Sequence, residues 1–241
     1  MDIYPMNLKE VSPIEKPKFR HEIKHFINIS DYYTLQSRLK HIATIDSFAG
    51  SDGTYQVRSL YFDTPENKAL MDKFNGISRR EKFRLRFYNN DPSFIRLEKK
   101  SKTNGLCCKR KVSISKEQCK KLLQGDIDWL FISGEVLLQE LYAKMKHQLL
   151  RPKTVVDYAR EAYIYKPGNV RITFDSHLQS GLFFWDFLAP DLPTVAMTSN
   201  DKVILEVKFD EFLPELIRDI IQTNQRRSSS ISKYAACRIF G

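Results

Sequence analysis

Short segments in which charged and apolar residues alternate recur along the chain. Because successive side chains of a strand point to opposite faces, each such segment predicts a strand with one ionic face and one more apolar face. The ionic faces are mostly cationic, and three of the four clearest examples contain a glutamate. These examples are Arg20-Glu22-Lys24, Lys82-Arg84-Arg86, Arg96-Glu98-Lys100 and Glu206-Lys208. The pattern predicts a closed sheet, lined with charge, that holds a polyanion and a metal ion.

Eight segments have the alternation and the flanking turn residues of strands. They cover residues 18–28, 57–64, 80–88, 93–102, 108–115, 153–165, 170–175 and 203–210. Apolar residues at helical spacing and helix-start residues predict helices between them. These helices cover residues 30–42, 65–74, 115–125, 133–150 and about 211–224. The order of elements predicts an α+β fold of about eight antiparallel strands with flanking helices.

Capping residues predict where several helices begin and end. Ser30 is expected to cap the first helix, and Pro65 suits the first turn of the second. Ser115 and Gln118 have the spacing of a capping box, and Gly125 follows the last turn of the same helix. These signals define the starts of three helices and the end of one.

The chain divides into a tail and one domain. Residues 1–17 contain three prolines and no sustained periodicity, so we expect a tail there and a single domain over residues 18–241. With 42% hydrophobic and 12% aromatic residues, the 241-residue chain has enough apolar side chains for a substantial core. Intrinsic disorder of the whole chain is therefore excluded.

The charge balance favours an anionic partner. A formal net charge of +10 suits nucleic acid, an acidic membrane surface or phosphorylated small molecules. The four cysteines include no CxxC pair, so we interpret them as reduced thiols. The N-terminus lacks a signal-peptide pattern, and no segment approaches the roughly 20 apolar residues that span a bilayer. We therefore expect a soluble, cytoplasmic protein.

The sequence contains none of the standard glycine-rich nucleotide loops, serine elbows or kinase motifs. One literal match to a catalytic motif is HExxH, at His21–His25. In zinc peptidases this motif lies on a helix, so that both histidines converge on one metal ion. Here the surrounding residues alternate as in a strand, so we do not expect a zinc peptidase.

Two further predicted strands have the same cationic bias. Lys109 and Lys111 alternate with apolar positions on one of them, and Arg171 shares a face with Asp175 on the other. A sheet with a long cationic face repels itself unless a ligand offsets the charge. The repetition therefore strengthens the prediction of an anion-binding site.

Three glutamates lie on the cationic faces, namely Glu22, Glu98 and Glu206. Each either pairs with a neighbouring lysine or arginine or binds a divalent cation. Magnesium and manganese accept such oxygen ligands, and phosphate oxygens would complete the coordination shell. The residues alone leave both interpretations open.

Nine short sequences, in order, resemble those of the VTC domain, the polyphosphate polymerase branch of the triphosphate tunnel metalloenzymes. They are RHEIK, SLYFDTP, FRLRFY, RLEKKSK, KRK, YAREAY, VRITFD, LEVKF and SKY. The resemblance covers about residues 18 to 238 and implies an eight-stranded antiparallel β-barrel that forms a tunnel lined with basic residues and glutamates. It also implies that the tunnel binds ATP and Mn²⁺ or Mg²⁺ and transfers the γ-phosphate to a growing polyphosphate chain, releasing ADP.

The resemblance assigns roles to individual residues. The catalytic, phosphate-binding cations that it implies are Lys24, Arg84, Arg86, Lys100, Lys109, Arg160, Arg171, Lys208 and Lys233. Glu206 matches the metal-binding glutamate, with Glu22 and Glu98 as further metal candidates. We add Arg20, Lys111 and Ser232 as substrate-binding candidates.

The sequence departs from the family pattern at two positions. Arg20 stands where the wider superfamily has the first glutamate of an ExExK motif. Ser230 stands where the eukaryotic members tend to have a lysine, a loss for which Arg226 or Arg227 could compensate. The incomplete ExExK motif argues against a triphosphate or nucleotide hydrolase of the same fold.

The expected partners are ATP and inorganic polyphosphate, and coupling of synthesis to transport would need a separate membrane protein. Two alternatives stay open, a hydrolase of the same fold and a non-catalytic polyphosphate-binding module. A nucleic-acid partner is not expected, because the basic residues follow strand alternation and form neither a basic helix face nor an aromatic stacking platform.

Overall fold

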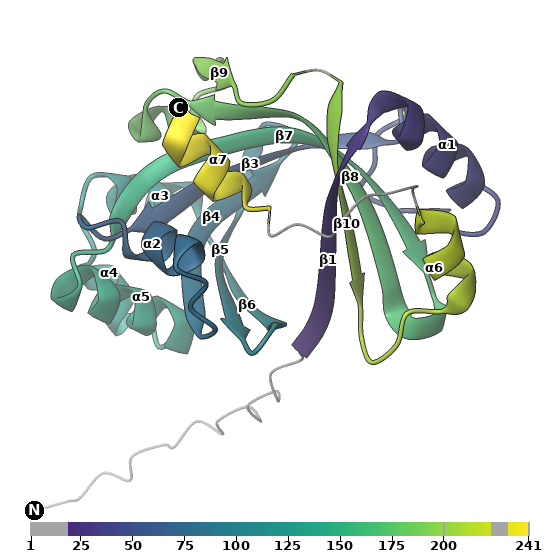
Figure 1. Cartoon of the computed structure of the whole chain (residues 1–241). Coiled ribbons are helices and arrows are strands. Elements are labelled where there is room, and N and C mark those ends of the chain that lie inside the picture. The colour runs from purple at the N-terminus through teal and green to yellow at the C-terminus, as the bar shows by residue number, and fades with distance from the viewer. Residues whose placement is uncertain (1–18, 200, 223–230, 241) are drawn as a thin grey trace, which may run out of the picture.

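The computed structural model describes residues 19–199, 201–222 and 231–240. Eight antiparallel strands close into a ring in the order β7-β3-β4-β5-β6-β1-β10-β8, and β8 pairs again with β7 (Figure 1). The strands are β1 (Phe19–Asn28), β3 (Thr54–Asp63), β4 (Arg80–Tyr88), β5 (Asp91–Thr103), β6 (Leu106–Ile114), β7 (Arg151–Tyr165), β8 (Val170–Gly181) and β10 (Lys202–Phe209). The predicted eight-stranded antiparallel barrel is confirmed. The predicted tail at 1–17 lies outside the described residues.

Two short strands lie beside the ring. Strand β2 (Thr44–Ile45) pairs with β7, and β9 (Thr194–Ala196) pairs with β8. Within the ring, β1 pairs with β10 along His21–Asn28. Its pairing with β6 is much shorter and consists of Phe19 opposite Cys108 and Arg20 opposite Cys107.

The apolar core lies mainly outside the barrel wall. Phe83, Leu85 and Phe87 of β4 are buried in a cluster beneath three helices. These helices are α3 (Lys116–Leu123), α4 (Asp128–Ile132) and α5 (Val136–His147). On the other side, a second cluster that includes Leu35 and Ile217 packs beneath α1 (Ile29–Leu39) and α6 (Glu215–Ile221). On β4 the alternation thus directs the apolar side chains outward, and Arg84 and Arg86 point inward.

The last described helix, α7 (Lys233–Phe240), packs against β7, β8 and α2 (Lys68–Phe74) (Figure 1). Tyr234 and Ala235 of α7 belong to a third apolar cluster, which also contains Tyr61 of β3 and Tyr158 of β7. The N-terminus of α7 thereby reaches the inward face of the sheet.

Some predicted element boundaries are wrong. Asn28, not Ser30, caps α1, and its side chain accepts a 2.7 Å hydrogen bond from the Asp31 amide. The helix predicted from Pro65 begins three residues later, at Lys68. The helix predicted over 133–150 is α5 and is shorter, Val136–His147, and the preceding helix α4 was not predicted. The two are separated at Gly134, whose φ of 75° requires the conformational freedom of glycine.

Other local predictions are confirmed. Ser115 and Gln118 form both hydrogen bonds of a capping box on α3, and the HExxH segment at His21–His25 lies on β1, not on a helix. The strand predicted at 170–175 continues to Gly181 through a bulge near His177. No helix in the described ranges is long and apolar enough to cross a bilayer.

We predict that Leu85→Ala destabilises the protein by about 2–5 kcal/mol, because Leu85 is completely buried between the barrel wall and the helices. The matched control is Ile132→Ala on α4, whose side chain is 80% exposed and should change stability by less than about 0.5 kcal/mol. Denaturant unfolding measures both effects. Equal effects would contradict the location of the core outside the barrel.

Candidate functional site

The barrel interior contains a network of ion pairs centred on Glu206 of β10. Its carboxylate lies 2.5 Å from Lys208 Nζ and 3.7 Å from Lys24 Nζ on the neighbouring strand β1. Lys233 Nζ from α7 and the Arg160 guanidinium from β7 lie 3.9 and 4.0 Å away. Burial opposes ionisation of Glu206, but these four cations hold its pKa well below the usual range. The carboxylate is therefore charged in the absence of any ligand.

Glu22 of β1 extends this network toward β5. Its carboxylate lies 2.6 Å from Lys100 Nζ and 2.7 Å from Lys24 Nζ, and 4.0 Å from Lys208 Nζ. Burial and the charge of Glu206 raise the pKa of Glu22, whereas the three lysines lower it, with a net result of about 2. Lys24 therefore bridges two carboxylates that the sequence proposed as metal ligands.

Asp175 of β8 is a member of the site that the sequence reasoning did not select. Arg160 donates two hydrogen bonds to it, of 2.6 and 2.8 Å, and Lys233 Nζ lies 2.5 Å away. Burial opposes its ionisation, but Arg160 and Lys233 lower its pKa to about 2. The sequence showed only that Asp175 shares a strand face with Arg171; its position directly opposite Arg160 comes from the β7–β8 register in the structure.

A second ionic group lies on β4, β5 and β6. Arg84 pairs with Glu98 at 2.7 Å and donates a 2.8 Å hydrogen bond to the Tyr61 hydroxyl. Lys109 also pairs with Glu98. Burial, together with the charges of two arginines, lowers the pKa of Lys109 to about 7 despite Glu98. Burial raises the pKa of Tyr61, but the cations around it, chiefly Arg84, lower it to about 8.

Arg86 completes this group without a carboxylate of its own. It donates hydrogen bonds of 2.8 Å to the Ser59 hydroxyl and 3.1 Å to the Tyr158 hydroxyl. These hydrogen-bond partners are neutral, and the nearest compensation of the guanidinium charge comes from the more distant carboxylate of Glu98. The tyrosines and Ser59 were not identified from the sequence.

The remaining predicted residues lie at the edge of the network. Arg171 pairs with Asp46 and donates to the Tyr55 hydroxyl at 3.0 Å, and Arg20 pairs with Asp210 at 2.9 Å. Lys111 is exposed on β6. Ser232 accepts a 3.2 Å hydrogen bond from Lys82 Nζ and a 3.3 Å bond from the Ala235 amide.

Helix α7 is anchored beside the network by Tyr234. Its hydroxyl donates a 2.5 Å hydrogen bond to the buried carboxylate of Asp63, and its ring stacks on Tyr61 at 5.1 Å between centroids. The same carboxylate accepts hydrogen bonds from the amides of Ala69 and Leu70 at the start of α2. This arrangement fixes Lys233, the neighbour of Tyr234, in the interior.

The carboxylates fit a hard divalent cation as a partial ligand set. Glu206 and Glu22 provide oxygen donors linked through Lys24. Within the described ranges, no three aspartate, glutamate, histidine or cysteine side chains are grouped closely enough to hold a metal ion unaided. Magnesium in phosphate-binding sites is commonly held by one or two carboxylates together with substrate phosphates, and these residues suit that arrangement. Glu98 instead pairs with Arg84 and Lys109.

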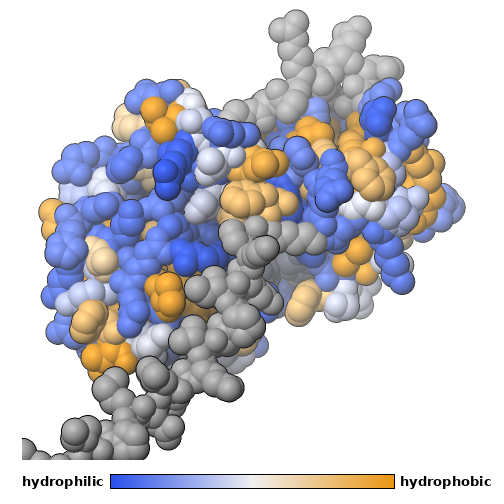
Figure 2. All heavy atoms as spheres, turned by 90° about the horizontal axis from the view of Figure 1, so that it is seen from below, coloured by the Kyte–Doolittle hydropathy of each residue, from blue (hydrophilic) through white to orange (hydrophobic). Residues whose placement is uncertain are grey.

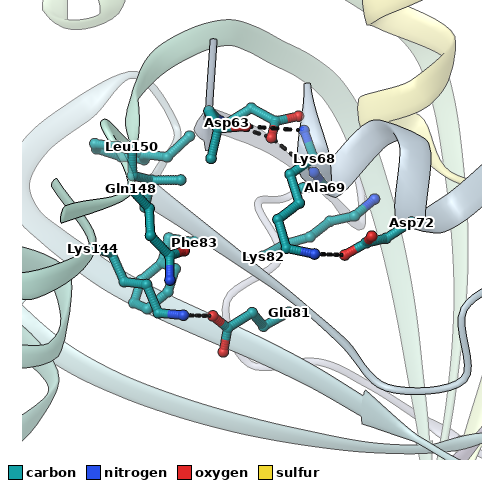
Figure 3. Close-up of a pocket in the computed structure, with 12 residues that line it drawn as sticks. Asp63, Lys68, Ala69, Asp72, Glu81, Lys82, Phe83, Lys144, Gln148 and Leu150 are labelled. Atoms are coloured by element: carbon teal, nitrogen blue, oxygen red, sulfur yellow. Dashed lines mark hydrogen bonds and ion pairs between the residues drawn. The ribbon is translucent and has the colours of Figure 1, made fainter. Parts of the chain in front are cut away.

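A pocket beside the barrel offers a contrast to the interior. It lies between α2, β4 and α5, and two of its three lysines form ion pairs within it (Figure 3). Lys68 lies 2.8 Å from Asp72, and Lys144 lies 2.5 Å from Glu81. The third lysine, Lys82, donates instead to the Ser232 hydroxyl, so the pocket has no cluster of uncompensated cations comparable to the interior.

Together the two ionic groups form an anion-binding interior with excess positive charge. Eight cationic side chains surround four carboxylates. The cations are Lys24, Arg84, Arg86, Lys100, Lys109, Arg160, Lys208 and Lys233, and the carboxylates are Glu22, Glu98, Asp175 and Glu206. The carboxylates stabilise the ligand-free state, and the remaining charge suits a ligand with several phosphates.

The fold of the chain is similar to that of solved structures of other proteins. A protein from Hippeastrum, described as having a dominant triphosphatase activity, superposes with a TM-score of 0.52 at 14% identity, over 91% of this chain and 95% of that one. A candidate adenylate cyclase from Bacillus halodurans matches with a TM-score of 0.49 at 16% identity, over 79% and 80% of the two chains. No match was found among curated protein sequences.

The model of one protein family matches almost the entire described chain. It is the VTC domain, and the match covers residues 19–239. That range contains all eight strands of the barrel and every residue of the ionic interior. The chain therefore belongs to the VTC domain family and has the triphosphate tunnel fold.

Proposed function

We propose that the protein is a metal-dependent polyphosphate polymerase that transfers the γ-phosphate of ATP to a growing inorganic polyphosphate chain. The observation that carries the proposal is the excess of cations that line the barrel interior around a smaller set of largely buried carboxylates. Such an interior suits a substrate and a product that both consist of linked phosphates. Membership of the VTC domain family supports the same conclusion.

The interior cations would act by positioning and by electrostatic stabilisation. Phosphoryl transfer passes through a loose transition state whose charge is spread over the equatorial oxygens. Arg84 and Arg86 on β4 and Arg160 on β7 present guanidinium groups suited to such oxygens. Lys24, which bridges Glu22 and Glu206, would hold the reacting phosphates close to the carboxylates.

Glu206 and Glu22 would hold the magnesium or manganese ion. When bound, the metal ion would neutralise part of the negative charge that develops on the phosphate oxygens. Lys208 lies 2.5 Å from Glu206 and keeps its carboxylate oriented and charged.

The acceptor chemistry favours transfer to phosphate. The second pKa of a phosphate monoester is about 6, so a terminal phosphate oxygen is anionic at neutral pH and needs no general base. Hydrolysis would instead require a positioned water molecule. A triphosphatase is nevertheless the second candidate, because Glu22 and Glu206 flank Lys24 in a way that would also suit metal-assisted hydrolysis.

The cellular setting follows from the reaction. ATP is the phosphate donor, so we expect the protein to act in the cytoplasm. Export of the polymer would require a separate membrane protein.

The proposal is tested by separating the products of ATP turnover. Purified protein is incubated with ATP and Mn²⁺ or Mg²⁺, and ADP, free phosphate and polymer are quantified separately. We expect ADP and phosphate chains in matched amounts. Formation of ADP with free phosphate would support the triphosphatase, and binding of polyphosphate without turnover would support a binding module.

We predict that Arg84→Ala and Glu206→Gln each reduce turnover by about 10²-fold or more, because each removes a preorganised charge from the reacting phosphates. Polymer formation and thermal unfolding are measured in parallel. Lys116→Ala, on the exposed face of α3, is the control and should keep full activity. Near-normal activity of either interior variant would show that the site is elsewhere.

We predict that tripolyphosphate binding weakens between pH 7 and 9. Burial and neighbouring arginines lower the pKa of Lys109 to about 7, and the pKa of Tyr61 is about 8. A bound polyanion favours the protonated forms of both groups, so binding above these values takes up protons. Calorimetry at pH 8 in buffers of different ionisation enthalpy measures this uptake.

The variant Lys109→Gln isolates the contribution of the lysine. It should take up fewer protons than the unmodified protein under the same conditions. Equal proton uptake by the two proteins would contradict the assignment of Lys109 to the phosphate site.

A further inference from the structure

The inward face of β4 and β5 continues toward the β5–β6 hairpin as two rows of cations. Cross-strand pairing places Lys82 opposite Lys100 and, one step nearer the hairpin, Arg80 opposite Lys102. We call these four residues the cation ladder, with Lys82 and Lys100 as its inner pair and Arg80 and Lys102 as its outer pair. Figure 1 shows the hairpin at the lower end of the barrel, beside the start of β1.

The two pairs differ in their partners. In the inner pair, Lys100 Nζ lies 2.6 Å from Glu22, and Lys82 Nζ donates to the Ser232 hydroxyl at 3.2 Å. In the outer pair, Arg80 donates to the Ile77 carbonyl oxygen at 2.7 Å. Within the described part of the chain, no carboxylate lies within ion-pair distance of Arg80 or Lys102. The outer pair therefore keeps two uncompensated positive charges.

The outward face of the same strands shows the opposite arrangement. Lys99 of β5 pairs with Glu81 at 2.6 Å and with Glu140, which also pairs with Arg110 of β6. Like charges directly opposite each other destabilise a sheet. The outward cations are neutralised by the protein itself, whereas the opposed outer pair lacks this neutralisation and suits an anion from outside.

The outer pair also belongs to a continuous positive field. The pKa of Lys73 on α2 is lowered by burial and then by the positive charges of Arg80, Lys102 and Lys24. Lys24 in turn contacts both Glu22 and Glu206 in the interior. Figure 2 shows that this end of the molecule, viewed from below, is largely hydrophilic where grey atoms do not cover it. The positive field thus extends from the proposed reaction centre to the rim.

We propose that Arg80 and Lys102 form an exit site that binds the part of a polyphosphate chain extending beyond the barrel. The inference rests on the proposed function for the identity of the ligand. The triphosphate of ATP is held by the interior cations, and a chain reaches the outer pair only when it is longer. Contacts of this kind are electrostatic and release counterions on binding, so they depend on salt.

The test compares binding of tripolyphosphate and of long-chain inorganic polyphosphate to the full chain, without ATP. We expect Arg80→Gln/Lys102→Gln to weaken binding of the long chain by about tenfold, because each lost charge removes a contact about as strong as an exposed ion pair. Its affinity for tripolyphosphate should stay within about twofold of the unmodified protein. The slope of log affinity against log salt for the long chain should fall by about 1.4, the value for two charges on a single-stranded polyanion.

Two control variants separate the site from general charge. Lys116→Gln/Lys120→Gln removes the same charge from exposed positions on α3 and should change neither affinity. Arg80→Lys/Lys102→Arg keeps both charges and should retain tight binding of the long chain. Thermal unfolding confirms that each variant is folded.

Two results would overturn the exit site. One is unchanged binding of the long chain by Arg80→Gln/Lys102→Gln. The other is an equal loss of affinity for both ligands, which would show that the outer pair contributes only to the overall positive charge of the barrel. The proposed function fails separately. If Arg80→Gln/Lys102→Gln weakens binding of the long chain selectively, as expected, but the unmodified protein makes no polymer from ATP, the site binds polyphosphate and the polymerase assignment is wrong.

Discussion

The barrel depends on the compensation of positive charge in its interior by four carboxylates. An unpaired buried ion costs several kcal/mol of desolvation, so the lysines and arginines on the inward faces could not stay there alone. Glu206 contacts cations from β10, β1, α7 and β7, and Asp175 on the neighbouring strand β8 contacts two of the same cations, Arg160 and Lys233. The ligand-free barrel is therefore held in shape by the charges that a phosphate chain would partly replace.

This interior is possible because the apolar core lies elsewhere. Phe83, Leu85 and Phe87 point outward into the cluster beneath α3, α4 and α5, while Arg84 and Arg86 of the same strand point inward. One alternating sequence thus provides both the hydrophobic contacts that stabilise the wall and the charges that form the site. The apolar contacts do not depend on what occupies the barrel.

The faces of the strands could be predicted from the sequence because alternation is a local property. The charged faces of β1, β4, β5 and β10 lie inward as one set, as the spacing of their charges indicated. Which charges meet depends on register, and register is set by contacts between distant strands. The pairing of Arg160 with Asp175 therefore escaped the sequence reasoning, although both residues lie in recognised segments.

The same limit explains the boundary errors. Asn28 and Ser30 are both good helix caps, and β1 continues to Asn28 because that residue pairs with Lys202 of β10. The tyrosines of the site were missed for a related reason. Tyr61 and Tyr158 look like core residues in the sequence, and only the fold shows that their hydroxyls contact Arg84 and Arg86.

The anchoring of α7 by Asp63 has a consequence for the entropy of binding. A lysine side chain has many rotamers in solution, and immobilising it on a ligand costs roughly 0.5–1.5 kcal/mol. Lys233 is already held by Asp175, and its helix is fixed by the Tyr234–Asp63 hydrogen bond and by stacking on Tyr61. Much of that ordering is therefore completed during folding. Asp63 contacts no interior cation itself, yet by fixing α7 it orders the Lys233 side chain before the ligand binds.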